Sequence, residues 1–510
     1  MPSVEANLAN NLARTAATYP TNTAVKLDDA EIDFRTLNGL GMKVAGLLSE
    51  RSVADGDRIA LVMPNVPHTV ALYYGILRLG AIVVPMNPLL KAREVAFHLE
   101  DSGAELVFVW EAFADEVKKA AEPLGVDVVV VGPDFITSVS SAPTIETITS
   151  KDDDDVAVVL YTSGTTGRPK GASLTHANMR KNAEVSVNLM GTSSDDVIFG
   201  GLPLFHVFGQ TCCMNAGILM GAMLTLLPRF DPEKALHIVE RDKVTVFAGV
   251  PTMYVAMLRC PERKNVDVSS WRLSASGGSA LPVEVLSAWD EEFPNATIIE
   301  GYGLSETSPV VCFNQLDVGR KPGSIGTPVT GIDMKIVDPV GEELPAGEVG
   351  EIVIRGHAVM KEYWGNPKAT AEAIPDGWFR TGDLARVDED GFFFIVDRKK
   401  DMIVRGGYNV YPREVEEVLY SHPAVNEAAV VGRPDSLHGE EIVAVVSLRE
   451  DAEGAGDEDG RQKLAAELIE FAKERLAAYK YPREVEFIGE LPKGPTGKIL
   501  KRSITVEPEK

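Results

Sequence analysis

The first half of the chain alternates short apolar runs with amphipathic stretches of helical spacing, and this alternation restricts the fold more than any other feature. The apolar runs at 57–63 and 106–110 are predicted strands, and the stretches at 44–51 and 92–102 are predicted helices. Strands without alternating polar residues are buried on both faces, as in a parallel sheet covered by helices. A second run of the same kind spans about 196–300. We therefore predict an α/β fold with two helix-covered, mostly parallel sheets.

Two changes of pattern divide the rest of the chain. After about residue 322, strand-like segments follow one another without long helices, which predicts a β-rich subdomain. The charge run Asp397-Arg398-Lys399-Lys400-Asp401 then lies between two apolar strands, where a joint between domains is expected. We predict a large N-terminal domain at 1–398 and a small, mobile α+β domain at 399–510.

A loop rich in glycine, hydroxyl groups and cations follows the apolar run at 156–160. It reads Tyr-Thr-Ser-Gly-Thr-Thr-Gly-Arg-Pro-Lys-Gly from Tyr161 to Gly171. Glycines let the backbone approach a ligand, hydroxyls donate hydrogen bonds, and cations neutralise phosphate charge. The loop is not a Walker A motif, because Pro169 precedes Lys170 and glycine follows it. It predicts a triphosphate site, with a polar surface turn as the alternative.

The composition of the whole chain argues against some classes of partner and some cellular locations. A formal net charge of −25 implies no basic surface, which argues against nucleic acid. Four cysteines form neither a disulfide framework nor a metal motif, and no secretory signal is visible, so we expect a cytoplasmic protein. The apolar run from Val70 to Met86 is interrupted by Arg78, Gly80 and Pro85, which argues against a membrane span. Peripheral membrane contact and the choice between monomer and homodimer stay open.

The loop string resembles the phosphate-binding signature of the adenylate-forming, or AMP-binding, superfamily. This superfamily includes acyl-CoA synthetases, luciferases and nonribosomal peptide adenylation domains. Its signature strings occur in the expected order over essentially the whole chain. The resemblance implies that the loop residues bind ATP, namely Thr162, Ser163, Gly164, Thr165, Thr166, Gly167 and Lys170.

Further strings match the rest of the superfamily's nucleotide site. In the superfamily, a string like that at 300–307 holds adenine, magnesium and the adenylate phosphate, and a loop like that at 276–280 lines the adenine and acyl sites. The residues implied here are Gly278, Ser279, Ala280, Glu300, Gly301, Tyr302, Gly303 and Thr307. Glu306 and Thr166 are the implied Mg²⁺ ligands, through oxygen. Asp383 matches the ribose-binding aspartate, Arg398 the ribose and phosphate contact, and Lys400 the hinge.

Lys498, in the string from Leu491 to Ile499, matches the mobile catalytic lysine of the superfamily. A carboxylate that attacks an α-phosphate builds charge on the in-line oxygens, and a cation placed there stabilises the transition state. The implied catalytic residues are Lys498, Thr307, Glu306 and His206. The implied reaction has two steps, in which Mg·ATP and a carboxylic acid form an acyl-adenylate and pyrophosphate before a thiol takes the acyl group.

The segments at 406–410 and 412–416 resemble those of free-standing acyl-CoA synthetases. This resemblance implies CoA as the acceptor, with Gly406, Gly407 and Tyr408 at its site. A carrier-loading fatty acyl-AMP ligase, a luciferase-like oxygenase and a non-catalytic nucleotide-binding protein are the alternatives.

The segment at 201–209 matches the wall of the superfamily's acyl pocket. The implied pocket residues are His206, Phe208, Gly209, Val250, Gly277 and Val310. No Lys or Arg lies between Leu202 and Leu227, so a distal carboxylate such as that of malonate has no counter-charge there. The apolar residues of this stretch favour a medium- or long-chain fatty acid. An aryl-propenoate of the cinnamate or coumarate type is the alternative, because Phe208 suits an unsubstituted ring, although phenolic-acid ligases typically carry a tyrosine at this place.

Overall fold

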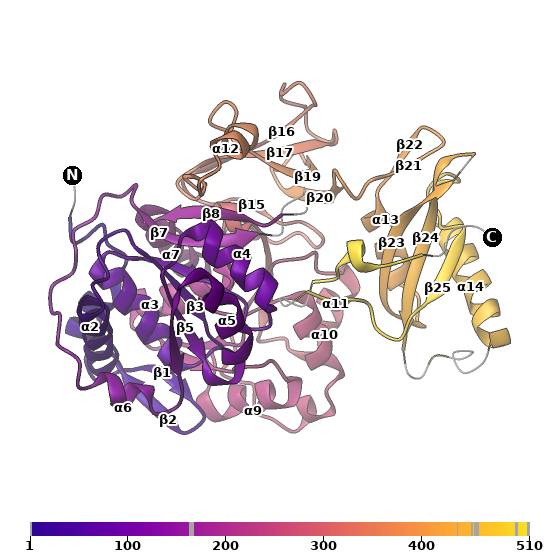
Figure 1. Ribbon diagram of the computed structural model, residues 1–510. Coiled ribbons are helices and arrows are strands. Elements are labelled where there is room, and N and C mark those ends of the chain that lie inside the picture. Colours follow the sequence, from indigo (N-terminus) through magenta and orange to yellow (C-terminus); the bar gives the residue numbers. More distant parts are fainter. Residues whose placement is uncertain are drawn as a thin grey trace.

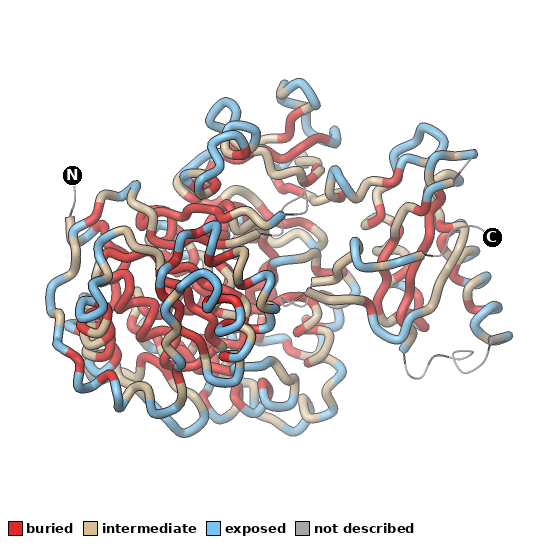
Figure 2. The backbone as a smooth tube through the Cα atoms, viewed as in Figure 1, coloured by how far each residue is buried: buried red, intermediate tan, exposed pale blue. Residues whose placement is uncertain are grey.

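The computed structural model describes residues 3–162, 168–435, 437–449, 452, 458–494 and 498–506. Within these residues the strands form four sheets. Figure 1 shows a broad N-terminal lobe, a small sheet above it, and a C-terminal lobe set to one side. Buried residues concentrate in the sheets and the helices against them, whereas the outer loops are exposed (Figure 2). No described helix combines the length and the apolar character that crossing a lipid bilayer requires.

The first sheet of the large lobe has the strand order β18-β8-β7-β4-β3-β5-β6. Its pairs from β7 through β4, β3 and β5 to β6 are parallel, and β8 is antiparallel to both β7 and β18. The strands are β3 (Arg58–Val62), β4 (Ile82–Pro85), β5 (Leu106–Trp110), β6 (Asp127–Val131), β7 (Val156–Thr162), β8 (Lys170–Thr175) and β18 (Glu362–Tyr363). Helices around this sheet include α3 (Pro67–Leu79), α4 (Ala92–Ser102) and α5 (Ala114–Ala121).

The second sheet has the order β15-β14-β13-β12-β11-β9-β10-β1-β2. The strands are β1 (Thr23–Leu27), β2 (Ala30–Asp33), β9 (Val197–Gly200), β10 (Met223–Leu226), β11 (Val246–Gly249), β12 (Leu273–Ser276), β13 (Thr297–Tyr302), β14 (Cys312–Phe313) and β15 (Thr327–Pro328). The pairs from β1 to β13 are parallel. The other α-helices of the large lobe are α1 (Ala9–Thr18), α2 (Phe34–Glu50), α6 (Phe135–Val139), α7 (His176–Met190), α8 (Ala216–Met220), α9 (Pro232–Asp242), α10 (Pro251–Arg259) and α11 (Val283–Glu292).

One hydrophobic core joins these two sheets. It contains buried residues of the first sheet, such as Val83 and Leu160, together with Ile198 and Leu224 of the second. Because both faces of the central strands are covered, the strand sequences are continuously apolar. The predicted arrangement of two helix-covered, mostly parallel sheets is confirmed.

Two smaller units follow the large sheets, and the strand pairs of the first are all antiparallel. The first consists of β16 (Ile332–Val337), β17 (Gly350–Gly356), β19 (Phe379–Val387) and β20 (Phe393–Arg398), with the short helix α12 (Pro367–Ala373). The C-terminal unit consists of β21 (Ile403–Arg405), β22 (Tyr408–Val410), β23 (Val425–Asp435), β24 (Gly439–Leu448), β25 (Glu484–Phe487), α13 (Pro412–Tyr420) and α14 (Glu458–Lys473). The C-terminal unit has its own hydrophobic clusters. The turn at 399–401 connects it to the unit before it.

Candidate active site

The candidate site begins at the carboxyl ends of three neighbouring parallel strands. Gly249 of β11 pairs with Ser276 of β12, which pairs with Glu300 of β13. The loops after these strands therefore leave the sheet at one edge, which is where ligands bind in open α/β sheets. This topology brings together four of the predicted segments, namely Val250, Gly277 to Ala280, Glu300 to Gly303 and the turn that carries Glu306 and Thr307.

Asp383 joins this edge to the antiparallel unit above it. The Tyr302 hydroxyl donates a hydrogen bond of 2.6 Å to Asp383 Oδ2, and Arg398 Nε lies 3.3 Å from Asp383 Oδ1. Asp383 and Arg398 are direct partners in the β19–β20 ladder, so backbone pairing sets their proximity. Asp383 is only 5% exposed. Three residues predicted from three separate strings thus form one hydrogen-bonded and ion-paired group.

Glu306 is held by groups from the first sheet. It lies in the short 3₁₀ turn η5 (Ser305–Thr307) and is 9% exposed. Thr162 Oγ1 donates to Glu306 Oε1 at 3.2 Å, and the Tyr363 hydroxyl donates to the same oxygen at 2.9 Å. Lys170 Nζ lies 4.9 Å from the centre of the Tyr363 ring. This contact brings the end of β7 and the start of β8 to the 300–307 string.

The predicted residues Ser163, Gly164, Thr165, Thr166 and Gly167 lie outside the described residues. At the start of β8, a cavity of about 160 Å³ is lined by Asp101, Pro169, Lys170, Gly171, Trp364, Gly365 and Asn366. Lys170 therefore borders this cavity.

Lys498 comes from the C-terminal end of the chain. The yellow segment in Figure 1 extends from the small lobe back toward the large lobe. Burial, followed by the charge of Arg398, lowers the pKa of Lys498 to about 8. Burial, followed by the charge of Lys498, lowers the pKa of His206 to about 4. The charge of Lys498 therefore interacts with those of Arg398 and a protonated His206.

His206 and Phe208 form one wall of the predicted acyl pocket. The Phe208 backbone N–H donates to His206 Nδ1 at 3.3 Å. Because Nδ1 accepts a hydrogen bond, the proton of the neutral ring is on Nε2. A Cβ on Gly277 would lie 3.2 Å from the Phe208 ring, and a Cβ on Gly209 would lie 2.4 Å from the Pro203 carbonyl oxygen.

The remaining predicted pocket residue, Val310, is held by a residue that sequence reasoning missed. Asn182 of α7 is fully buried. Its amide donates to the Val310 carbonyl at 2.7 Å and accepts from the Val310 N–H at 2.9 Å. This bidentate pairing fixes the backbone after η5 against α7.

Several predicted nucleotide residues also hold the loops themselves. Glu300 is buried and accepts the Leu281 N–H at 3.0 Å, and burial raises the pKa of Glu300 to about 7. The buried Thr307 hydroxyl accepts the Leu304 N–H at 2.8 Å. A Cβ on Gly301 would lie 2.0 Å from the Phe313 ring, and one on Gly303 would lie 1.4 Å from the Pro309 carbonyl oxygen. Packing within the protein thus requires glycine at both positions, and their roles toward a base stay predictions.

The predicted CoA residues lie apart from these groups. Gly406 and Gly407 form the turn between β21 and β22, with φ of 57° and 83°, where glycine is favoured. Tyr408 is 60% exposed and stacks on Tyr479 with 4.8 Å between ring centres. Figure 1 shows the β21–β22 hairpin at the top of the small lobe. Lys400 is exposed in the connecting turn.

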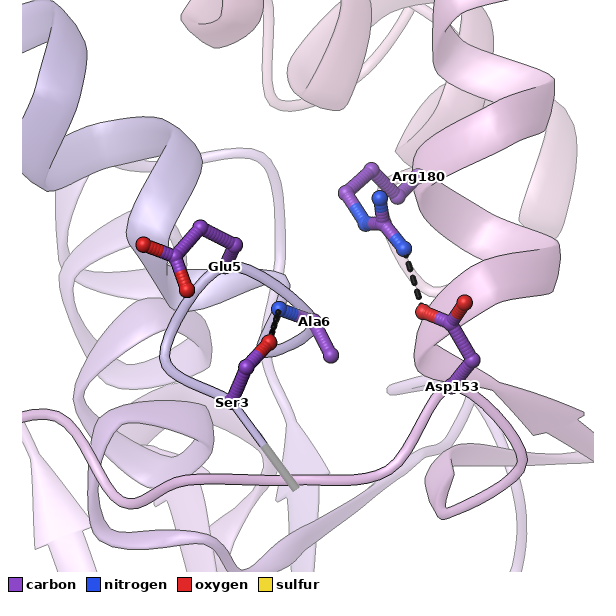
Figure 3. Close-up of a pocket in the computed structure, with 5 residues that line it drawn as sticks. All are labelled: Ser3, Glu5, Ala6, Asp153 and Arg180. Atoms are coloured by element: carbon purple, nitrogen blue, oxygen red, sulfur yellow. Dashed lines mark hydrogen bonds and ion pairs between the residues drawn. The ribbon is translucent and has the colours of Figure 1, made fainter. Parts of the chain in front are cut away.

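A second cavity, of about 300 Å³, lies elsewhere on the large lobe. It is lined by Ser3, Glu5, Ala6, Asp153 and Arg180, and an ion pair of 2.5 Å joins Arg180 to Asp153 (Figure 3). None of its lining residues belongs to the predicted site.

Comparison with known proteins decides the family. The profile of the AMP-binding enzymes matches residues 12–364. The chain belongs to this family. The profile of the AMP-binding enzyme C-terminal domain matches residues 414–498. This AMP-binding enzyme is an acid–thiol ligase of the acyl-CoA synthetase branch.

Similar proteins cover nearly the whole chain. A long-chain-fatty-acid–CoA ligase of Bacillus subtilis (strain 168) is 38% identical and is matched over 99% of this chain and 95% of its own. A feruloyl-CoA synthase of an Amycolatopsis species is also 38% identical and is matched over 96% of this chain and 97% of its own. The crystal structure of a benzoate CoA ligase from Burkholderia xenovorans LB400 superposes with a TM-score of 0.89 at 30% identity. The match covers 97% of this chain and 99% of that one.

Proposed function

We propose that this AMP-binding enzyme activates a medium- or long-chain fatty acid as an acyl-adenylate and transfers the acyl group to CoA. The observation that carries the choice of acid is the buried segment after Phe208, which we propose as the wall of the acyl pocket. There the π-helix η3 (Gly209–Asn215) continues into α8, and all residues from Gly209 to Ile218 are buried. Apolar side chains predominate, and the stretch contains no Lys or Arg. Such a wall suits a hydrocarbon tail. The likeness to a long-chain-fatty-acid–CoA ligase supports the same choice.

An aromatic acid is the second candidate. The Phe208 ring is buried and its edge lies against Gly277, so a flat substrate would find an aromatic partner there. The likeness to a feruloyl-CoA synthase, at the same 38% identity, favours this candidate too.

In the proposed first step, a carboxylate oxygen of the acid attacks the α-phosphorus of ATP and pyrophosphate leaves. Asp383 accepts hydrogen bonds from the ribose hydroxyls, because a carboxylate can accept two hydrogen bonds in parallel. The ammonium of Lys498, beside Arg398, stabilises the negative charge that builds on the α-phosphate oxygens. The Nε2–H of neutral His206 is available as a donor to the acid.

A magnesium ion fits the residues present. Glu306 accepts both of its described hydrogen bonds on Oε1, which leaves Oε2 without a partner among the described residues. One carboxylate together with substrate phosphates is a usual Mg²⁺ environment, and the ion supplies charge neutralisation of the triphosphate. Glu306 would hold it, with Thr166 as the second predicted ligand.

In the proposed second step, the small domain, residues 399–510, turns about Lys400. This motion removes Lys498 and brings the turn at Gly406 and Gly407 to the adenylate. The CoA thiolate attacks the acyl carbonyl carbon, and AMP leaves with the electron pair of the broken carbon–oxygen bond. The charge interactions of Lys498 with Arg398 and His206 support its proposed part in the first step.

A panel of acids tests the proposal. The purified enzyme would be incubated with ATP, Mg²⁺, CoA and acids from acetate to oleate, together with cinnamate, coumarate and ferulate, and CoA-dependent AMP formation would be measured. We expect the largest kcat/KM for a medium- or long-chain fatty acid. The largest kcat/KM for an aryl-propenoate would replace the first candidate with the second. AMP release that is indifferent to CoA would contradict the proposed acceptor.

A further inference from the structure

Lys498 lies on a hairpin that is closed by backbone hydrogen bonds. The Gly494 N–H donates to the Lys498 carbonyl at 2.7 Å, and the Leu500 N–H donates to the Pro492 carbonyl at 2.8 Å. The turn η6 (Lys501–Ser503) follows directly. The position of Lys498 therefore depends on how the two ends of this hairpin are attached to the small lobe.

An ion pair attaches each end. Lys493 Nζ lies 3.1 Å from Glu427 Oε2 before the hairpin, and Lys501 Nζ lies 2.7 Å from Glu416 Oε1 after it. The Lys501 and Glu416 side chains are only 23% and 14% exposed. Glu416 Oε1 also accepts the Val430 N–H at 2.7 Å, so β23 fixes this carboxylate from the other side. A largely buried charge pair of this kind has a defined geometry, and removal of one partner is costly.

Lys501 also faces the joint between the lobes. The charges of Asp397 and Asp401 act on its ammonium in addition to that of Glu416. Asp397, at the end of β20, is fixed by the N–H groups of Arg398 at 2.7 Å and Arg413 at 2.9 Å. The Lys501 cation is thus attracted both by a carboxylate of the small lobe and by one at the end of the antiparallel unit.

We propose that Lys501, through its ion pair with Glu416, is a positioning residue that holds Lys498 in place for adenylate formation. This inference rests on the proposed two-step function. A displacement of a catalytic group by 1 Å can slow a reaction about 100-fold. Thioester formation proceeds without Lys498 in the site, so loss of the ion pair should slow the first step alone.

The chain offers a matched control for this test. Lys480 Nζ lies 2.7 Å from Glu414 Oε1, on the same helix α13 and at the same distance, but it is not part of the hairpin. We would compare Lys501→Met with Lys480→Met in two assays, acid-dependent ATP–pyrophosphate exchange and conversion of preformed acyl-adenylate to acyl-CoA. We expect Lys501→Met to slow exchange about 100-fold with conversion unchanged. Lys480→Met should leave both rates unchanged.

Two further variants separate positioning from folding. Glu416→Gln keeps an acceptor for the Val430 N–H but removes the charge, so it should show the same split between the two assays. Lys501→Arg should restore exchange, since it keeps a cation at this place. Equal losses in both assays for Lys501→Met and Glu416→Gln, or no loss in either, would overturn the proposal. Absence of acyl-CoA formation by the unchanged enzyme would instead refute the proposed function, and exchange would still report on Lys501.

Discussion

The Tyr302 hydroxyl donates a 2.6 Å hydrogen bond to Asp383, whose other carboxylate oxygen faces Arg398 Nε at 3.3 Å. One buried carboxylate thus organises an aromatic ring and a cation from opposite sides. The same two oxygens are the groups proposed to bind the ribose hydroxyls. Binding of ATP at this point would therefore involve an exchange of hydrogen bonds on Asp383.

Asp383→Asn should weaken ATP binding. A hydrogen bond to a charged group contributes about 1.5–3 kcal/mol, so the KM for ATP should rise about tenfold or more. Tyr302→Phe leaves the carboxylate intact and should have a smaller effect. The KM for ATP of both variants would be measured from steady-state pyrophosphate release at saturating acid. An unchanged KM for ATP in Asp383→Asn would refute the ribose assignment.

Tyr363→Phe should change the response to magnesium. The substitution removes one of the two donors to Glu306 Oε1 but keeps the ring below Lys170. Groups that orient a metal ligand typically affect metal affinity 10–100-fold, so half-maximal adenylation should require about tenfold more Mg²⁺. The measurement is a Mg²⁺ titration of ATP–pyrophosphate exchange at fixed ATP. A superimposable titration curve would argue against Glu306 as a magnesium ligand.

The rate of adenylate formation should fall on the alkaline side. Burial lowers the pKa of Lys498 to about 8, so the side chain is an ammonium below this pH and loses its charge above it. The kcat/KM of ATP–pyrophosphate exchange should therefore fall about tenfold per unit at higher pH. Lys498→Arg, which stays protonated, should lack this fall. A profile of the unchanged enzyme that is flat to pH 10 would contradict the assignment.

Gly277→Ala should narrow the acyl pocket. The added Cβ would lie 3.2 Å from the Phe208 ring, so this ring must move by a few tenths of an ångström beside the space proposed for the tail. The ratio of kcat/KM for a short acid to that for a long acid should rise about tenfold, because the longer acid would be used less well. The measurement is the ratio of kcat/KM for octanoate and palmitate. A loss of the same factor for both acids would indicate that Gly277 does not border the tail.

The sequence predicted the sheets better than the extent of one helix. Predicted strands such as 106–110 match their observed bounds, because apolar runs in a covered parallel sheet are distinctive. The helix predicted at 44–51 begins instead at Phe34, after Asp33, whose side chain accepts the Thr36 N–H. Gly39 and Gly41 obscured its first half, since glycine disfavours helices. A Cβ on Gly41 would lie 3.8 Å from the Gly75 backbone of α3, an ordinary contact distance, so packing does not require glycine there.

The motifs predicted the residues of the candidate site but not the residues that support them. Asp383, Arg398 and Tyr302 were found because each belongs to a recognisable string. Tyr363 and Asn182 were missed because their partners, Glu306 and Val310, are distant in sequence and only the fold brings them together. The pairing of Lys501 with Glu416 likewise has no local sequence signal.

The central claim is that Lys498 serves adenylate formation and leaves before CoA reacts. Lys498→Ala, measured in single-turnover assays of the two half-reactions, tests it most directly. Loss of a positioned charge at the reacting phosphate should slow pyrophosphate release about 100-fold or more. The same variant should convert preformed acyl-adenylate and CoA to acyl-CoA at the rate of the unchanged enzyme. Equal losses in both half-reactions would contradict the account.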